Sequence, residues 1–79
     1  MTEATEVDAR RLLCPMPVIR LQNQMNQQPA GSQVRIICTD PGTLNDIPAW
    51  CRINQHTILE CDQQAHEIIF LVKKSDESA

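Results

Sequence analysis

The chain has 79 residues, of which 42% are hydrophobic and 22% charged, and its formal net charge is −3. This length supports one small domain and excludes two, and the excess of acidic over basic residues disfavours direct binding to nucleic acid. No apolar run approaches the roughly 20 residues of a membrane-spanning helix, and the polar N-terminus lacks a secretory signal. We therefore expect a cytoplasmic protein.

The four cysteines stand at positions 14, 38, 51 and 61, without a C-x-x-C pair. In a protein that lacks a secretory signal, free thiols are expected rather than disulfides. The two histidines, His56 and His66, lie far from any paired ligand spacing. We therefore expect no metal and no cofactor.

The first predicted element is a short strand from Glu6 to Ala9, with Val7 and Ala9 turned inward. It leads into the stretch R-L-L-C-P-M-P, whose prolines at 15 and 17 are tolerated in the first turn of a helix, where backbone N–H groups lack internal partners. Proline also favours an extended conformation in the residue before it, as an N-cap requires. Cys14 is therefore predicted to cap a helix from Pro15 to about Gln28.

This position favours chemistry at Cys14. As the N-cap, its sulfur would face the Met16 N–H and the positive end of the helix dipole, which both favour thiolate over thiol. The positive charges of Arg10, Arg11 and Arg20 would add to this effect. We therefore predict that Cys14 is a nucleophile.

The middle of the chain continues with a strand and a second helix. Residues 33–39 are β-branched and alternate, which predicts a strand. A tight turn follows at 40–43, and the second helix starts at Thr43 or at Asp46. Pro48 favours the later start, because its missing N–H then falls in the first turn. The predicted apolar face of the first helix consists of Val18, Leu21 and Met25. That of the strand consists of Val34, Ile36 and Cys38, and that of the second helix consists of Leu44, Ile47 and Cys51.

Two further strands are predicted at 57–61 and 67–73, joined by a four-residue loop at 62–65, because this loop lacks an Asn-Gly turn. The last strand is apolar on both faces, which is typical of a central strand or of one whose second face meets a partner.

The predicted order β-α-β-α-β-β closes most simply as a two-layer α/β (α+β) sandwich, a four-stranded mixed sheet with both helices on one face. We expect one domain over residues 1–79, with an ordered core at about 6–74 and polar tails at both ends. The uncovered sheet face, a candidate contact surface, would expose Ile37, Ile58, Ile69 and Leu71.

The other thiols are weaker candidates for chemistry. Cys38 and Cys61 have inward phase in their strands and are interpreted as core residues. Cys51 follows Trp50 on the inner phase of the second helix, where packing is the commoner role, yet it remains the one plausible second thiol. A cysteine hydrolase would pair its thiolate with a histidine, and no such signature is present. Thiol exchange needs only an accessible thiolate.

Two motifs carry a family resemblance. The segment V-D-A-R-R-L-L-C-P-M-P-V-I-R resembles the signature of the TusA family of sulfur carrier proteins, in which C-P-x-P opens a helix. The later T-D-P-G-T-L-N-D-I-P-A-W-C resembles the second block of that family. The resemblance extends from about Val7 to Lys73.

The resemblance implies a sulfurtransferase-type persulfide carrier, which relays sulfur and is not a stand-alone enzyme. Cys14 would receive sulfane sulfur from a cysteine desulfurase or rhodanese and pass it to an acceptor protein, toward tRNA thiolation, molybdenum cofactor biosynthesis or sulfur oxidation. Pro15 and Pro17 match the helix-start prolines of the family, and Cys51 matches a cysteine present in some members. Structural roles are implied for the remaining motif matches Asp8, Asp40, Asp46 and Pro48.

One position departs from the family pattern. Members usually carry glycine where this chain has Arg11, and an arginine held at positive φ would be strained by roughly 1 kcal/mol or more. Its charge could instead steer an acidic partner. Arg20 keeps the charge of the family's usual lysine.

Three other functions remain open. The C-P-x-P edge could serve only to dock a regulatory partner, the α/β architecture could bind RNA, or Cys14 could sense redox state with Cys51 as resolving thiol. The acidic composition and the shortage of aromatic side chains count against RNA. A Cys14→Ser substitution separates carriage from docking. We expect a monomer when the protein is free.

Overall fold

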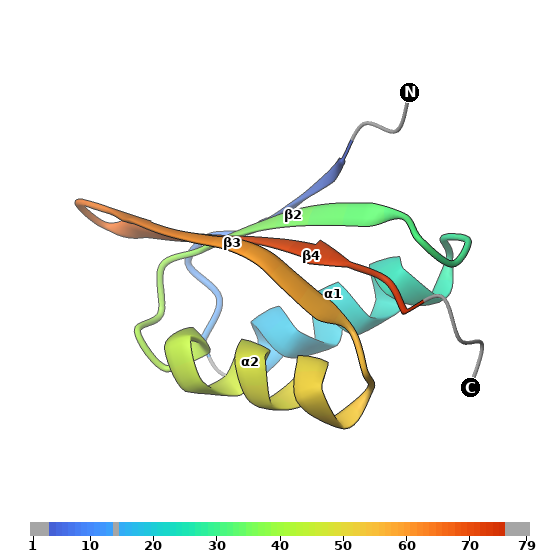
Figure 1. Cartoon of the computed structure of the whole chain (residues 1–79). Helices are drawn as coiled ribbons and strands as arrows, with labels where there is room; N and C mark the ends of the chain where they lie inside the picture. The colour runs from blue at the N-terminus through green and yellow to red at the C-terminus, as the bar shows by residue number, and fades with distance from the viewer. Residues whose placement is uncertain (1–3, 14, 76–79) are drawn as a thin grey trace.

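The computed structural model describes residues 4–13 and 15–75 and contains two 11-residue helices and four strands (Figure 1). The elements are β1 (Thr5–Ala9), α1 (Met16–Asn26), β2 (Gln33–Cys38), α2 (Thr43–Ile53), β3 (Thr57–Gln64) and β4 (Glu67–Lys73). Within these described ranges, neither helix is long and apolar enough to cross a membrane.

The strands form one mixed sheet in the order β1-β2-β4-β3. β1 runs parallel to β2, and β4 runs antiparallel to both β2 and β3. Figure 1 shows both helices on the same face of this sheet. The predicted two-layer fold is therefore confirmed, and so is the central place of β4 that its two apolar faces indicated.

The core lies between the sheet and the helices. α1 and α2 each bury one side, and the inward residues of β1, β2 and β4 meet them from the sheet. Phe70 is the largest side chain that is fully buried, at 1% exposed, and a burial of this kind stabilises a fold by roughly 1.5–3 kcal/mol. The core residues of the strands and helices are Val7, Ala9, Leu21, Met25, Val34, Ile36, Cys38, Ile47, Cys51, Ile68, Phe70 and Val72.

The predicted later start of the second helix is wrong. α2 begins at Thr43, with Gly42 as N-cap, and Pro48 lies inside it. Its first turn is organised by Asp40, whose carboxylate accepts the Gly42 N–H at 3.0 Å and whose carbonyl accepts the N–H and the hydroxyl of Thr43 at 3.0 and 2.8 Å. This turn offsets the one backbone hydrogen bond that Pro48 removes.

The predicted four-residue loop between the last two strands is also wrong. β3 continues to Gln64, which pairs with Glu67, so that only Ala65 and His66 form the turn. Ala65 adopts a positive φ of 23° without the Asn-Gly sequence that such turns favour. The β3–β4 hairpin therefore extends beyond the helices (Figure 1).

The uncovered face of the sheet differs in part from the prediction. Ile58 pairs with Val72 and packs against the core on the helix side, because a register shift between Ile58 and Glu60 changes the phase of β3. Ile37 is buried at 8% exposed. Ile69 and Leu71 are half-buried in a groove of about 250 Å³, whose other lining residues are Arg35, Glu60, Asp62 and Gln64.

Candidate functional site

The candidate site lies at one edge of the sheet. Because β1 and β2 are parallel, their carboxyl ends meet at this edge, and each continues into the loop that precedes a helix. The pairing of Cys38 with Ile68 brings the turn of the β3–β4 hairpin to the same edge (Figure 1). Two segments that are distant in sequence, the loop after β2 and the turn of the hairpin, thus lie at the same edge as the loop that contains the predicted nucleophile.

Cys14 itself lies outside the described residues. Its neighbours Leu13 and Pro15 are both exposed, Leu13 to 75%. The N-cap of α1 is Pro15, with φ −98° and ψ 15°, and not Cys14 as we predicted. The helix therefore begins one residue later than expected, at Met16, and Pro17 is its N2 residue.

The backbone donors at the start of α1 are already engaged. The Met16 N–H, which we predicted to face the Cys14 sulfur, donates to the Leu13 carbonyl at 2.9 Å. The Val18 and Ile19 N–H groups donate to the Pro15 carbonyl at 3.1 and 3.2 Å, and the two prolines have no N–H. The Met16 N–H therefore has a backbone partner, while its predicted contact with the Cys14 sulfur lies outside the described residues; the helix dipole would also favour an anion here.

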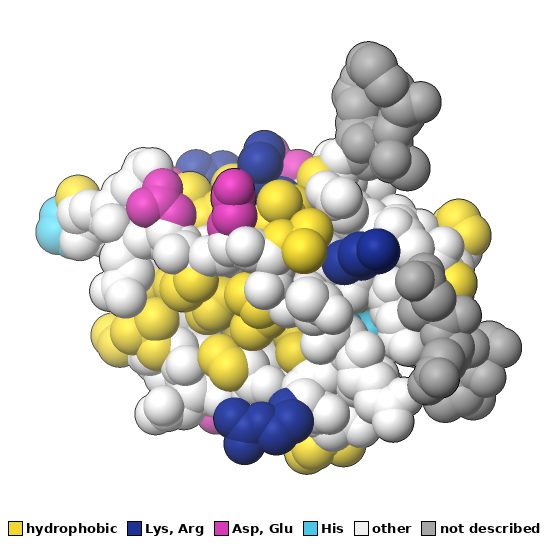
Figure 2. Space-filling view, viewed as in Figure 1, with side chains coloured by type: hydrophobic (Ala, Val, Ile, Leu, Met, Phe, Trp, Pro, Cys, Tyr) yellow, Lys and Arg dark blue, Asp and Glu magenta, His cyan; other side chains and the backbone are white. Residues whose placement is uncertain are grey.

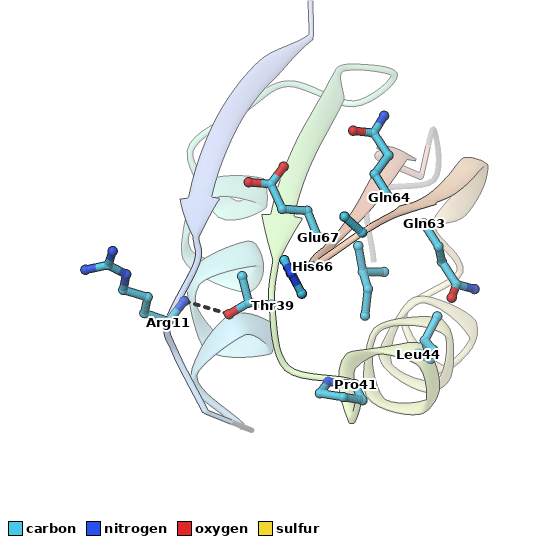
Figure 3. A pocket seen from close by; sticks show the side chains of 10 residues that line it. Arg11, Thr39, Pro41, Leu44, Gln63, Gln64, His66 and Glu67 are labelled. Carbon is cyan, nitrogen blue, oxygen red and sulfur yellow. Dashed lines mark hydrogen bonds between the residues drawn. The ribbon is translucent and has the colours of Figure 1, made fainter.

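Arg11 adopts the left-handed conformation, with φ 69°. Its N–H donates to the hydroxyl oxygen of Thr39, at the end of β2, over 2.8 Å. Its side chain is exposed, and Figure 3 shows the guanidinium pointing away from the neighbouring cavity. We expected an arginine at the family's glycine position to be strained if its φ were positive. Arg11 has a positive φ, so this condition is fulfilled.

Arg10 is paired within the domain. Its guanidinium contacts Asp8 at 3.0 Å and Glu67 at 3.3 Å, and so connects the end of β1 with the start of β4. Hydrogen bonds from Arg10 lower the pKa of the Asp8 carboxyl, and the charge of Arg20 adds a smaller effect. Of the arginines predicted to support Cys14, Arg10 is therefore engaged in ion pairs with Asp8 and Glu67.

The remaining thiols differ in exposure. Cys51 is 2% exposed and Cys38 fully buried, and burial raises the pKa of each to about 11. The packing role of Cys51 is thereby favoured over a second reactive thiol. Cys61, predicted to be a core residue, is exposed, although it pairs with the buried Phe70. Its strand, β3, is an edge strand of the sheet.

A cavity of about 520 Å³ lies between the Arg11 loop, the start of α2 and the hairpin (Figure 3). Figure 2 shows hydrophobic side chains on the surface below the hairpin and above α2. Sequence reasoning missed this cavity, because its walls come from three separate segments. Its lining residues are Arg11, Thr39, Pro41, Leu44, Gln63, Gln64, Ala65, His66, Glu67 and Ile68.

Leu44, predicted on the inner face of α2, lines this cavity and is 36% exposed.

Other large apolar side chains lie close in sequence to the predicted nucleophile. Leu13, Met16 and Ile19, which we call the apolar rim, are exposed to 75%, 43% and 41%. Exposed apolar groups of this kind are typical of a surface that meets another protein.

The two histidines lie in different surroundings: His56 packs against Trp50, while His66 lines the cavity together with Arg11 and Thr39. The Nδ1 atom of His56 accepts the Ser75 N–H at 2.9 Å, and its ring lies 5.0 Å from that of Trp50. His66 belongs to the hairpin turn. Among the residues for which the structure gives positions, no group of three His, Cys, Asp or Glu could hold a metal ion.

The fold and the site define a class: a two-layer α/β domain in which a cysteine followed by proline, with exposed sequence neighbours on both sides, precedes the first helix. The family model described as "Sulfurtransferase TusA" matches residues 5–74. The chain therefore belongs to the TusA family.

Curated relatives agree with this assignment. The chain is 40% identical over 79 residues to a "Sulfur carrier protein TusA" of Pseudomonas syringae pv. syringae, with 96% of this chain and 92% of the relative covered. It is 33% identical over 70 residues to the protein of that name from Allochromatium vinosum, covering 89% and 92% of the two chains. A third protein of that name, from Pseudomonas fluorescens, is 33% identical over 69 residues, with 87% and 83% covered.

Proposed function

We propose that the protein is a sulfur carrier that holds sulfane sulfur as a persulfide on Cys14. The observation that carries the proposal is the family match over residues 5–74, within which the C-P-x-P sequence follows the exposed Leu13 and contains the exposed Met16. Cys38 and Cys51 are poor substitutes for Cys14, because both thiols are buried and burial raises their pKa values.

The proposed reaction consists of two thiol exchanges. In the first, the Cys14 thiolate attacks the outer sulfur of a donor persulfide, R–S–SH. A bond forms between the Cys14 sulfur and that outer sulfur, the S–S bond of the donor breaks, and the donor leaves as R–S⁻. In the second, an acceptor thiolate attacks the outer sulfur of Cys14–S–SH and restores the Cys14 thiolate. Sulfur moves at constant oxidation state, so neither step needs an oxidant or a reductant.

The surrounding residues have separate proposed roles. Pro15 and Pro17 fix the backbone at the start of α1, and because they lack N–H groups their role is geometric and not electrostatic. Met16 acts through its side chain, which belongs to the apolar rim, and not through its backbone N–H. Arg11 and Arg20 supply positive charge that favours the thiolate and the persulfide anion.

The proposed partners are a cysteine desulfurase or a rhodanese as donor and a downstream acceptor protein, with the apolar rim as a contact surface for them. The route beyond the acceptor would lead to tRNA thiolation, molybdenum cofactor biosynthesis or sulfur oxidation. In this proposal the 79 residues act as one cytoplasmic domain, monomeric when free, that touches no nucleic acid itself.

Intact mass spectrometry tests the proposal. The protein is incubated with a cysteine desulfurase and cysteine, or with a rhodanese and thiosulfate, and weighed before and after reductant. We expect a reductant-sensitive gain of one sulfur that Cys14→Ser abolishes. Cys61→Ser is the matched control, because it removes an exposed thiol elsewhere in the fold, and it should keep the gain. A gain that persists in Cys14→Ser, or no gain with either donor, would contradict carriage by Cys14.

A second candidate function is favoured by the exposure of the apolar rim. The C-P-x-P edge would then dock a partner without carrying sulfur. Calorimetric binding to the same desulfurase should survive Cys14→Ser and be abolished by Ile19→Glu under either function, so the readout that separates the two is sulfur uptake. Sulfur uptake by the wild-type protein would exclude docking as its whole function.

A further inference from the structure

The loop before Cys14 contains a strained residue whose conformation is held from outside the loop. At φ 69°, the Arg11 backbone lies in a region that costs energy for any residue with a Cβ. Such a conformation persists only where its surroundings impose it, and it occurs preferentially at functional sites. The structure should therefore contain a group that imposes it.

The group in contact with the Arg11 backbone is the hydroxyl of Thr39. The Thr39 Oγ1 atom accepts the Arg11 N–H at 2.8 Å, although the two residues are 28 positions apart. The neighbouring contacts are local or longer: the Asp8 carboxylate, two residues before, accepts the Arg10 N–H at 3.0 Å. The Leu12 N–H reaches the Ala9 carbonyl over 3.3 Å, and the contact of Arg10 with Glu67 is an exposed ion pair, which contributes little.

Thr39 is itself held in place on both sides. The preceding residue, Cys38, is fully buried and pairs with Ala9 on one side and Ile68 on the other. The following residue, Asp40, accepts three hydrogen bonds that form the turn into α2. The acceptor of the Arg11 N–H is thus a fixed point at the edge of the sheet.

We propose that Thr39 is a positioning residue for Cys14. By holding the Arg11 backbone in the left-handed conformation, its hydroxyl sets the direction in which the chain reaches Cys14 and the start of α1. The inference rests on the proposed function of Cys14 as the carrier. It assigns a role in sulfur transfer to a residue that does not touch the transferred sulfur.

The test replaces Thr39 with valine, which keeps the β-branched shape and removes the acceptor. Two rates are followed on the Cys14 peptide by mass spectrometry: sulfur uptake from the desulfurase, and alkylation by iodoacetamide as a function of pH. We expect Thr39→Val to slow uptake about fivefold, the factor that corresponds to one ordinary hydrogen bond. We also expect the midpoint of the alkylation profile to move to higher pH. Thr39→Ser, which restores the hydroxyl, should recover both.

Two further variants keep the test specific. Thr57→Val removes an exposed threonine hydroxyl from β3 and should change neither rate. Arg11→Gly removes the strain, so Thr39→Val in that background should slow uptake less than about twofold, because mutations in contact are not additive. Circular dichroism of each variant shows whether it is folded.

Unchanged uptake and an unchanged pH profile in folded Thr39→Val would overturn the inference. A failure of serine to restore both would do so as well, and so would an equal loss in the Arg11→Gly background. If the wild-type protein takes up no sulfur, the proposed function itself is wrong, while the alkylation profiles still decide whether Thr39 positions Cys14.

Discussion

The ammonium nitrogen of Lys74 lies 2.8 Å from the carbonyl oxygen of Met25, so that a residue after the last strand caps the C-terminal end of the first helix. It also donates to the carbonyl of Gln28. α1 has no basic residue in its last turn, and Lys74 supplies the positive charge that favours this end of the helix dipole. The end of the chain thereby stabilises the helix that follows the predicted nucleophile.

Replacing Lys74 with methionine should therefore destabilise the fold. We expect the free energy of unfolding to fall by about 2 kcal/mol, within the range of hydrogen bonds made by charged groups. Urea denaturation followed by circular dichroism measures it. Lys73→Met is the matched control and should change stability by less than about 0.5 kcal/mol, as is usual for surface substitutions. Equal losses in both variants would contradict the capping role.

Arg11→Gly should stabilise the protein. Glycine adopts the left-handed conformation without the Cβ penalty, although it gains entropy in the unfolded chain, so we expect a net increase of about 0.5–1 kcal/mol. Arg20→Gly, in the right-handed backbone of α1, should instead lose about 1 kcal/mol. Urea denaturation of the two variants gives opposite signs if Arg11 is strained, and the same sign if it is not.

The stability of the protein should decrease as the pH falls below 6.5. Burial, together with the charge of Lys74, lowers the pKa of His56 from its ordinary value of 6.5. A group with a lowered pKa binds protons more readily in the unfolded chain, so stability is lost as the pH falls from 6.5 through the folded-state pKa. The hydrogen bond from the Ser75 N–H to Nδ1 also requires that nitrogen to be unprotonated.

Urea denaturation between about pH 8 and pH 5 checks this dependence, a window above the range in which carboxylates titrate. His56→Gln should show a flatter profile than the wild type. His66→Gln removes the exposed histidine of the hairpin turn and should keep the wild-type profile. Parallel profiles for the wild type and His56→Gln would show that His56 does not cause the decrease.

Thiol labelling should separate the cysteines by burial. With iodoacetamide at pH 8, Cys61 should react in the native protein, while Cys38 and Cys51 should be protected until the protein unfolds. A shift of their pKa values from 9.0 to about 11 alone lowers the thiolate fraction about a hundredfold. Peptide mapping after timed quenching measures the rates. Rapid labelling of Cys51 in the native protein would favour the alternative function, in which Cys14 senses redox state and Cys51 is the resolving thiol.

The fold could be predicted because its packing follows from the local pattern of apolar residues in the sequence. The alternation of Val34, Ile36 and Cys38 specifies one inward face, and the structure buries all three residues. The apolar run of β4 specifies a strand with neighbours on both sides, and β4 lies between β2 and β3. Such features depend on side chains a few residues apart, which the sequence displays directly.

The errors arose where distant segments decide the structure. Pro48 suggested a later helix start, but the turn around Asp40 begins α2 at Thr43. Cys61 has inward phase, yet it is exposed because β3 is the edge strand of the sheet, and the order of the strands is not a local property. The bond between Arg11 and Thr39 joins two loops, and neither loop alone indicates it.

The parallel pairing of β1 with β2 affects when the nascent chain can fold during translation. Synthesis completes Cys14 well before β2, yet β1 can pair only after the chain has crossed back through α1, and such non-local pairing forms late compared with local contacts. A nascent chain that ends before Thr39 lacks the acceptor of the Arg11 N–H. A ribosome-bound chain of that length therefore contains Cys14 without the contact that we propose to position it.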